Sequence, residues 1–300
     1  MLNGVIIVNK EKGFTSHDAV AKLRGILKQK KIGHTGTLDP QAEGVLPVCL
    51  GNATKLCDIL TDKKKEYVAE LLLGVVTDTQ DTTGTVLKEM PVNLKEDQVR
   101  RAIASFEGKS MQIPPMYSAL KVKGKKLYEL AREGKVIERE PRPIEISELE
   151  ILSVNLPKVR IRVLCSKGTY IRTLCADIGE KLGCGGCMES LLRTRVEHFA
   201  LEDAHTLSQI EKIRDEGKLD SLIIPVDEIF SDLKKVHIMP EYAMFVENGN
   251  TCSMSLLQEI PEAEDGERFL MYHSNGKFYG IYEYAGQEEM LKPYKMFIPL

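Results

Sequence analysis

The 300-residue chain contains no tryptophan, eight phenylalanines and ten tyrosines. This scarcity argues against a broad aromatic platform on which single-stranded nucleic acid could stack. Long hydrophobic runs are also missing, and the longest, such as residues 5–8 and 71–73, are far too short to span a bilayer. Because the first residues include no basic flank, extended apolar region or small-residue cleavage site, we expect no secretory signal.

Neither sign of charge predominates. The 41 basic and 44 acidic residues leave a net charge of −3, which argues against a uniformly basic nucleic-acid binder. A local basic patch would still suffice, because the distribution of charge matters more than its sum. Seven cysteines, an odd number in a chain of this length, indicate reduced thiols in the cytoplasm. The length suggests one large domain, or one domain plus a small one.

The most informative stretch is residues 33–48, GHTGTLDPQAEGVLPV. Its three glycines permit backbone angles that are closed to other residues, or the close approach of a ligand. Pro40 disfavours helix at Asp39 and favours an extended or turn conformation there. A carboxylate on such a stiff loop is suited to catalysis, although an ordinary Asp-Pro turn is the simpler interpretation of these residues alone.

Apolar periodicity predicts a mixture of strands and helices. We expect strands at 5–8, 67–76, 144–156 and 159–165, a strand or a buried turn at 45–50, a strand from 191 onward, and helices at 16–28, 53–60, 95–106 and 207–213. Thr169 is a natural N-cap for a further helix up to Leu182, which would place Tyr170 and Arg172 in its first turn.

The C-terminal part has a different pattern. Residues 225–235 read as a linker, and glycines separate the short strand-like runs that follow it. These runs cover residues 243–246, 269–272, 278–282 and 295–298. The spacing is typical of a small β-barrel.

Three stretches resemble, in order, the motifs of bacterial tRNA pseudouridine synthases of the TruB type. The family's Gly-His-Thr-Gly-x-Leu-Asp-Pro motif is similar to residues 33–40. Its second signature is similar to residues 114–121, PPMYSALK, which are followed by a further match at 124–134. The third is similar to residues 165–174, CSKGTYIRTL. The resemblance covers residues 1 to about 230 and is less specific beyond them.

The resemblance implies an α+β fold with a central mixed, mainly antiparallel sheet flanked by helices. Residues 1–230 would form the catalytic domain and residues 235–300 a β-barrel-like PUA domain that binds RNA. An insertion at about 109–143 would be the family's flexible thumb, which orders on tRNA. Its core has eight bases against four acids, a surplus that favours RNA contact. The bases are Lys121, Lys123, Lys125, Lys126, Arg132, Lys135, Arg139 and Arg142.

The activity implied by the resemblance is conversion of a uridine to pseudouridine at position 55 in the TΨC loop of tRNA. The uridine must be extruded from the loop before its glycosidic bond can break and its base rejoin through carbon. Because the reaction needs neither redox change nor hydrolysis, we expect no cofactor and no metal. We also expect a cytoplasmic monomer that requires no protein partner and no membrane.

Asp39 is the catalytic carboxylate by its motif position. It could attack the sugar, attack the base or remove a sugar proton, and these routes stay open at this point. Arg172 is its partner by resemblance, and the nearby cation would oppose the rise in pKa that desolvation causes. A bidentate pair would also fix the direction of the carboxylate oxygens.

The resemblance also implies substrate-binding roles for other residues. Tyr67 would stack on the target base near C5, as a possible proton acceptor, and Tyr170 would line the pocket. His34 would fill the space that the extruded base leaves. Lys55 would contact RNA, and Leu191 would form an apolar wall of the pocket.

Three other interpretations compete. A guide-RNA-dependent pseudouridine synthase shares the aspartate motif and a PUA domain, but the 114–121 signature and the basic insertion favour the stand-alone type. A non-catalytic RNA-binding chaperone would not need Asp39 together with Tyr67, Tyr170 and Arg172. Cys184-x-x-Cys187 lacks the second ligand pair of a structural zinc site, so we do not expect zinc there.

Overall fold

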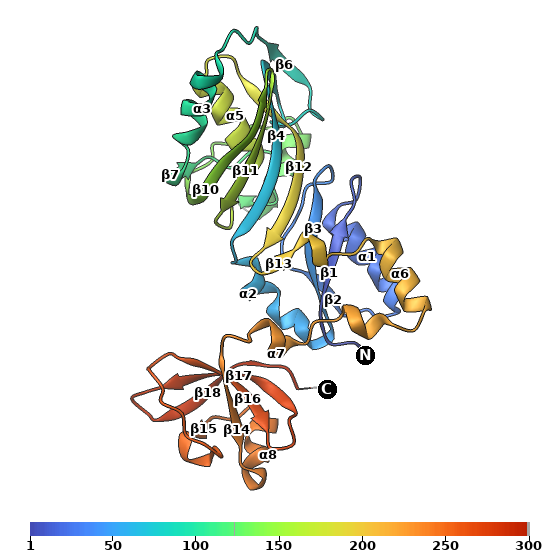
Figure 1. Cartoon of the computed structure of the whole chain (residues 1–300), viewed down its shortest axis with the longest axis vertical. Coiled ribbons are helices and arrows are strands. Elements are labelled where there is room, and N and C mark those ends of the chain that lie inside the picture. The colour runs from blue at the N-terminus through green and yellow to red at the C-terminus, as the bar shows by residue number, and fades with distance from the viewer. Residues whose placement is uncertain (123, 299–300) are drawn as a thin grey trace.

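A nine-stranded sheet runs through the larger part of the molecule (Figure 1). The structure, a computed structural model, describes residues 1–122 and 124–298. The strand order is β1-β3-β12-β4-β11-β10-β7, with β2 and β13 paired to β3 and β12. Only β3 and β12 pair in parallel, so the predicted mixed, mainly antiparallel sheet is confirmed. The strands are β1 (Gly4–Lys10), β2 (Ile32–His34), β3 (Glu43–Leu50), β4 (Lys65–Leu73), β7 (Gly108–Gln112), β10 (Arg142–Asn155), β11 (Lys158–Cys165), β12 (Gly186–Val196) and β13 (Phe199–Ala200).

Helices cover this sheet in two groups (Figure 1). One group lies beside β1 and the other beside β10 and β11. The first contains α1 (Ser16–Leu27) and α6 (Leu207–Asp215), and the second contains α3 (Glu96–Ala104) and α5 (Ile171–Lys181). Each has an apolar face; in α5 Leu174, Cys175 and Ile178 are buried in the cluster that contains the core residues of β4 and β11. The α+β class is therefore confirmed.

Some predicted boundaries are wrong. The strand expected at 67–76 ends at Leu73, because Gly74 adopts a φ of +87° that breaks the extended chain. The next residues form a separate hairpin of β5 (Val75–Thr77) and β6 (Val86–Glu89). The helix expected at 53–60 divides into a 3-10 turn, η1 (Gly51–Leu56), and the short α2 (Cys57–Thr61). Strand β12 begins five residues before the predicted position, since residues 186–190 already pair with β4.

The N-cap of α5 was also predicted wrongly. Tyr170, not Thr169, is the N-cap residue, and its side chain makes no capping bond. The Thr169 hydroxyl instead donates to the carbonyl of Ser166 at 3.0 Å. Gln112, from the distant strand β7, accepts from the Tyr170 N–H at 2.8 Å and so takes the capping role.

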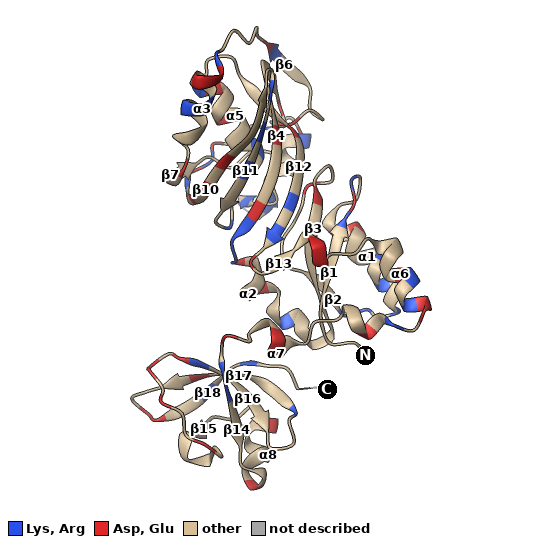
Figure 2. Ribbon diagram, viewed as in Figure 1, with Lys and Arg blue, Asp and Glu red and all other residues tan. Residues whose placement is uncertain are grey.

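The basic insertion is shorter than the predicted 109–143. Strand β7 pairs with the start of β10, so both predicted ends lie inside the sheet. The segment between them, residues 113–141, carries β8 (Lys121–Val122), β9 (Lys125–Lys126) and α4 (Leu127–Arg132). Lys123 lies outside the described residues. Figure 2 shows that charges of both signs are interspersed over the rest of the ribbon.

A smaller sheet, drawn in orange and red in Figure 1, follows residue 230. Its order is β14-β16-β17-β18-β15, an open half-barrel. The strands are β14 (Lys234–Ile238), β15 (Cys252–Ser253), β16 (Arg268–His273), β17 (Phe278–Ala285) and β18 (Met290–Met296). Residues 243–246, predicted as a strand, lie in the helix α8 (Ala243–Glu247), where Ala243 and Val246 bury one helical face. The predicted linker contains the helix α7 (Val226–Ile229), and β14 begins within its last two residues.

The two sheets share one apolar cluster. Leu270 and Tyr272 of the smaller sheet are buried together with Val5 and Val45 of the larger one and with Ile229 of α7.

Polar contacts reinforce this joint. The Asn52 amide donates to the Ile298 carbonyl at 2.7 Å, and Lys295 pairs with Asp58 at 2.8 Å. No helix in the described part of the chain is long and apolar enough to cross a membrane.

Candidate active site

The loop between β2 and β3 presents Asp39. Its backbone is held from outside: the Leu38 N–H donates to the Ser16 hydroxyl at 2.8 Å, and the Gly13 N–H donates to the Pro40 carbonyl at 2.8 Å. Leu38 itself is buried. The loop is therefore fixed on both sides of Asp39, while the Asp39 side chain keeps 39% of its surface exposed.

Arg172, in the first turn of α5, reaches Asp39 from the opposite side. Its Nε lies 2.9 Å from Asp39 Oδ2, and its side chain is only 6% exposed. The expected pairing is therefore present, but the expected bidentate geometry is wrong. The two terminal nitrogens donate to the carbonyls of Thr79 at 3.0 Å and Tyr117 at 2.7 Å. These bonds tie the guanidinium to two segments, because Thr79 lies in the polar loop after β5 and Tyr117 lies in the 113–141 segment.

Asp81 is a second carboxylate at this guanidinium, 3.9 Å from Arg172 Nε and 13% exposed. It accepts from the hydroxyl groups of Thr79 and Thr83. One buried cation thus faces two carboxylates, which compensates the charge of Arg172 and limits its movement.

Tyr67 and Leu191 lie on neighbouring strands, β4 and β12, and both are buried. They share an apolar cluster with Leu38 and Ala42 of the Asp39 loop. Burial raises the pKa of the Tyr67 phenol, so its hydroxyl is protonated at neutral pH. The structure therefore places a neutral phenol and an apolar side chain next to the loop that carries the carboxylate.

Tyr170 is half-buried at the start of α5, two residues before Arg172. Gln112 fixes its backbone from both sides, since it accepts from the N–H and donates to the carbonyl at 3.1 Å. Burial raises the pKa of the Tyr170 phenol, and the charges of Arg172 and Asp39 also act on it. Tyr170 therefore lies in the same site as Asp39 and Arg172.

His34 ends β2, and its Nδ1 accepts from the Gly36 N–H at 3.3 Å. Burial lowers the pKa of His34, with a contribution from the charge of Arg193, so its ring is neutral at physiological pH. Lys55 is not brought to the loop by its contacts. It lies in η1 and donates to the carbonyl of Met296 at 2.8 Å, where it joins the two sheets.

Sequence reasoning missed three buried basic residues near the loop, Lys10, Lys65 and Arg193. Lys10 donates to the carbonyls of Phe14 at 2.7 Å and Pro40 at 3.4 Å. Lys65 donates to the carbonyls of Thr61 and Lys63. Lys10 ends the apolar strand VIIVNK, and a basic residue in that position was a sequence feature that could have indicated a buried lysine.

Lys10 leads to a prediction about stability. Burial lowers its pKa from 10.5 to about 8, so the unfolded chain binds the extra proton between these values. The contribution of Lys10 to the free energy of unfolding should therefore increase from pH 8 toward 10.5, by about 1–3 kcal/mol. Urea denaturation of the wild type and of Lys10→Met over this range measures the difference. The exposed Lys12→Met is the control, and an equal pH dependence in the wild type and Lys10→Met would contradict the prediction.

Cys184 and Cys187 are both buried free thiols. Burial raises the pKa of Cys187 to about 11, which favours the protonated thiol over the thiolate that binds metal. No group of three or more metal-ligating side chains gathers anywhere in residues 1–122 and 124–298.

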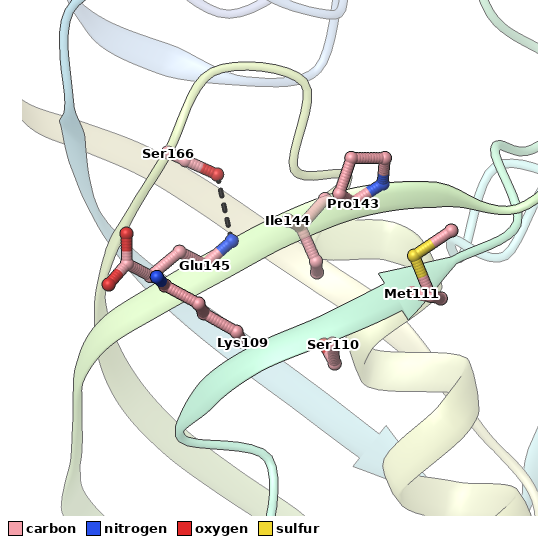
Figure 3. Close-up of a pocket in the computed structure, with 7 residues that line it drawn as sticks. All are labelled: Lys109, Ser110, Met111, Pro143, Ile144, Glu145 and Ser166. Atoms are coloured by element: carbon pink, nitrogen blue, oxygen red, sulfur yellow. Dashed lines mark hydrogen bonds between the residues drawn. The ribbon is translucent and has the colours of Figure 1, made fainter.

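An open groove lies along β7 and β10 at the base of the 113–141 segment (Figure 3). Ser166 is one of the residues that line it, and its hydroxyl accepts from the Glu145 N–H at 2.9 Å. The lining residues are Lys109, Ser110, Met111, Pro143, Ile144, Glu145 and Ser166. None of the residues that gather around Asp39 lines this groove.

Sequence models of one family match most of the larger part of the chain. Residues 24–171 match a model described as "TruB family pseudouridylate synthase (N terminal domain)". Residues 172–231 match one described as "tRNA pseudouridylate synthase B C-terminal domain". The boundary between the matches falls at Arg172.

Full-length relatives and solved structures agree. A tRNA pseudouridine synthase B of Lachnoclostridium phytofermentans is 52% identical, over 99% of this chain and 100% of the relative. That of Bacillus subtilis is 41% identical, over 99% and 98%. The structure of an H/ACA RNP bound to a substrate RNA containing 2'-deoxyuridine superposes with a TM-score of 0.74, at 26% identity, over 99% of this chain and 85% of that one.

A Cbf5-Nop10-Gar1 complex gives a TM-score of 0.73 at 28% identity, with coverage of 99% and 85%. These likenesses show the pseudouridine synthase fold. Identities above 40% over nearly the whole length, together with the two model matches, show that this chain belongs to the TruB family of tRNA pseudouridine synthases.

Proposed function

We propose that the protein isomerises a uridine of tRNA to pseudouridine, at position 55 of the TΨC loop. Family membership supports the reaction class. The observation that carries the proposal to this chain is the Asp39–Arg172 ion pair at 2.9 Å, next to Tyr67 and Leu191. The ion pair holds the carboxylate in place beside the apolar cluster in which the base would be bound.

The decisive experiment uses unmodified tRNA and no other RNA or protein. The purified chain is incubated with a tRNA transcript, and pseudouridine is mapped along the transcript. Pseudouridine at position 55 alone supports the proposal, and a transcript with cytidine at that position is the control. Absence of conversion with correctly folded protein would overturn it.

We assign the residues of the site as follows. Asp39 is the catalytic carboxylate and Arg172 its charged partner. Tyr67 stacks on the extruded base, Tyr170 and Leu191 line its pocket, and His34 fills the place that the base leaves. We expected Lys55 to contact RNA. We now propose a structural role for it, because its ammonium group donates to the Met296 carbonyl.

The reaction needs no group beyond these side chains. The glycosidic bond from C1′ to N1 breaks and a bond from C1′ to C5 forms within the same nucleotide. C5 loses one proton and N1 gains one, so atoms and electrons balance without a cofactor. Arg172 holds the Asp39 carboxylate in place, and the buried Tyr67 and Leu191 exclude water from the base. Extrusion of the uridine requires a few kcal/mol of unstacking, which contacts to the rest of the loop must supply.

We further propose that residues 1–230 form the catalytic domain and that residues 235–300 form a PUA-type RNA-binding domain. The open five-stranded half-barrel supports this assignment. We also propose a cytoplasmic monomer that acts without a protein partner; the match over the full length to a relative named as tRNA pseudouridine synthase B is consistent with this. Light scattering of the purified protein, alone and with tRNA, measures the number of copies.

A guide-RNA-dependent synthase is the second candidate, because two superposing structures are named as an H/ACA RNP and a Cbf5-Nop10-Gar1 complex. The identity to them is 26–28%, against 52% to the relative named as tRNA pseudouridine synthase B. Conversion of naked tRNA by the purified chain separates the two candidates, since a guide-dependent enzyme would leave that RNA unmodified.

The basic 113–141 segment predicts a steep salt dependence of tRNA binding. Neutralisation of phosphates releases counterions, so the slope of log Kd against log salt counts the contacts. We expect Lys121→Gln combined with Lys126→Gln to reduce that slope by about 0.7–0.9 for each contact removed. Filter binding at several salt concentrations measures it. Lys218→Gln, outside the segment, is the control, and equal slopes in all three proteins would contradict RNA contact by the segment.

A further inference from the structure

Arg193 of β12 is among the largest fully buried side chains, at 1% exposure, and has no role in the site as assigned above. Burial of a charge is unfavourable unless its donors are satisfied. Burial lowers the pKa of Arg193, yet arginine remains charged in proteins. A buried cation next to the Asp39 loop is therefore expected to have a specific role there.

The sheet puts Arg193 between two parts of the site. Strand β12 lies between β3 and β4, and Arg193 is opposite Gly44 on one side and Tyr67 on the other. Gly44 has a φ of +103°, and a Cβ there would lie 2.2 Å from the Arg193 carbonyl oxygen. The backbone of β3, just after the Asp39 loop, thus lies against β12 with no room for a side chain at Gly44.

The Arg193 side chain also contacts the residues on either side of Asp39. Its Nε donates to the Val45 carbonyl at 2.6 Å, and its Nη2 donates to the Gly36 carbonyl at 3.3 Å. Gly36 precedes Asp39 and Val45 follows it, so one planar group joins both ends of the loop. Tyr67 of β4 is paired directly with Arg193 in the antiparallel sheet, and residues paired in this way have their side chains on the same face.

We propose that Arg193 is a positioning residue, which holds the two ends of the Asp39 loop and the Tyr67 side chain in one fixed arrangement. It does not touch the substrate, because it is buried behind both. The inference rests on the proposed function, since it concerns how carboxylate and phenol meet the same uridine. Small displacements of reacting groups reduce rates strongly, so its loss should appear in the chemical step.

The test compares Arg193→Lys with Arg195→Lys. Both substitutions lie on β12 and keep the charge, but Arg195 is 42% exposed and pairs with Glu66 at 3.1 Å. Single-turnover pseudouridine formation is measured at saturating tRNA, and Kd for tRNA separately. We expect Arg193→Lys to slow the single turnover by about 10- to 100-fold with Kd unchanged, because one ammonium cannot reproduce the planar fork. Arg195→Lys should change neither.

A spectroscopic readout tests the contact with Tyr67. In protein labelled with 13C-tyrosine, the resonance missing from Tyr67→Phe identifies Tyr67. We expect that resonance to shift in Arg193→Lys and to stay in place in Arg195→Lys. Arg193→Gln, which keeps one donating group, replaces the lysine variant if that protein does not fold.

The outcomes are distinct. A lower melting temperature with a normal rate for each folded molecule would reduce Arg193 to a structural role and overturn the inference. An unshifted Tyr67 resonance would overturn it as well. A wild type that leaves tRNA unmodified would instead overturn the proposed function before any variant is compared.

Discussion

Asp39→Asn should abolish pseudouridine formation, with a loss of at least about 10⁴-fold in the single-turnover rate. The amide has nearly the same shape as the carboxylate but no charge to attack carbon or accept a proton. The change also leaves the loop in place, because its anchors at Leu38 and Pro40 are backbone groups. Quenched single-turnover assays on tRNA measure the rate, and filter binding measures Kd, which we expect to remain close to the wild-type value.

Asp62→Asn is the matched control. Asp62 is 60% exposed and pairs with Lys167 at 2.7 Å, so the same loss of one charge occurs away from the loop. This variant should convert tRNA at the wild-type rate. Turnover by Asp39→Asn near that of Asp62→Asn would remove Asp39 from the catalytic role.

Arg172→Met should have the second-largest effect, a fall of about 10²–10³-fold in the single-turnover rate. The substitution removes the cation from Asp39 and Asp81 and frees the carbonyls of Thr79 and Tyr117. We also expect a loss of about 2–4 kcal/mol in the free energy of unfolding. This is less than for a fully buried pair, because solvent reaches the Asp39 side chain.

Arg172→Lys separates charge from geometry. Lysine restores a cation but not the three directions in which the guanidinium contacts its partners, so we expect partial recovery of stability and little recovery of rate. Chemical denaturation gives the stability, and the rate is measured well below the melting temperature of each variant. Full recovery of rate by lysine would show that charge alone is required.

The sequence predicted most of the long strands of the sheet. The run 5–8 is buried and extended in the structure, and in 159–165 buried and exposed residues alternate as in a strand with one covered face. Contacts between distant residues decided the failures. Gln112 takes the capping role expected of Thr169, and it comes from a strand 58 residues away. Residues 243–246 are equally apolar in a strand or a helix, and packing against the smaller sheet selects the helix.

The residues of the candidate site also differ in how far the sequence could predict them. The Asp39–Arg172 pairing was available from the resemblance, whereas local pattern supported only an Asp-Pro turn. Arg193 could not be found by either route. In the alternation of LLRTRV it is indistinguishable from Arg195, and only the pairing of three strands buries one and exposes the other.

The apolar cluster shared by the two sheets affects how truncated forms should be interpreted. Removal of residues 235–300 would take Leu270 and Tyr272 out of the apolar cluster that they share with Val5 and Val45, and would leave the Asn52 amide without its carbonyl. Such a fragment would be prone to aggregation or partial unfolding for reasons unrelated to RNA. A loss of activity on deletion would therefore not measure how much the C-terminal unit contributes to recognition. Point substitutions on its solvent-facing side are the sounder way to ask that question.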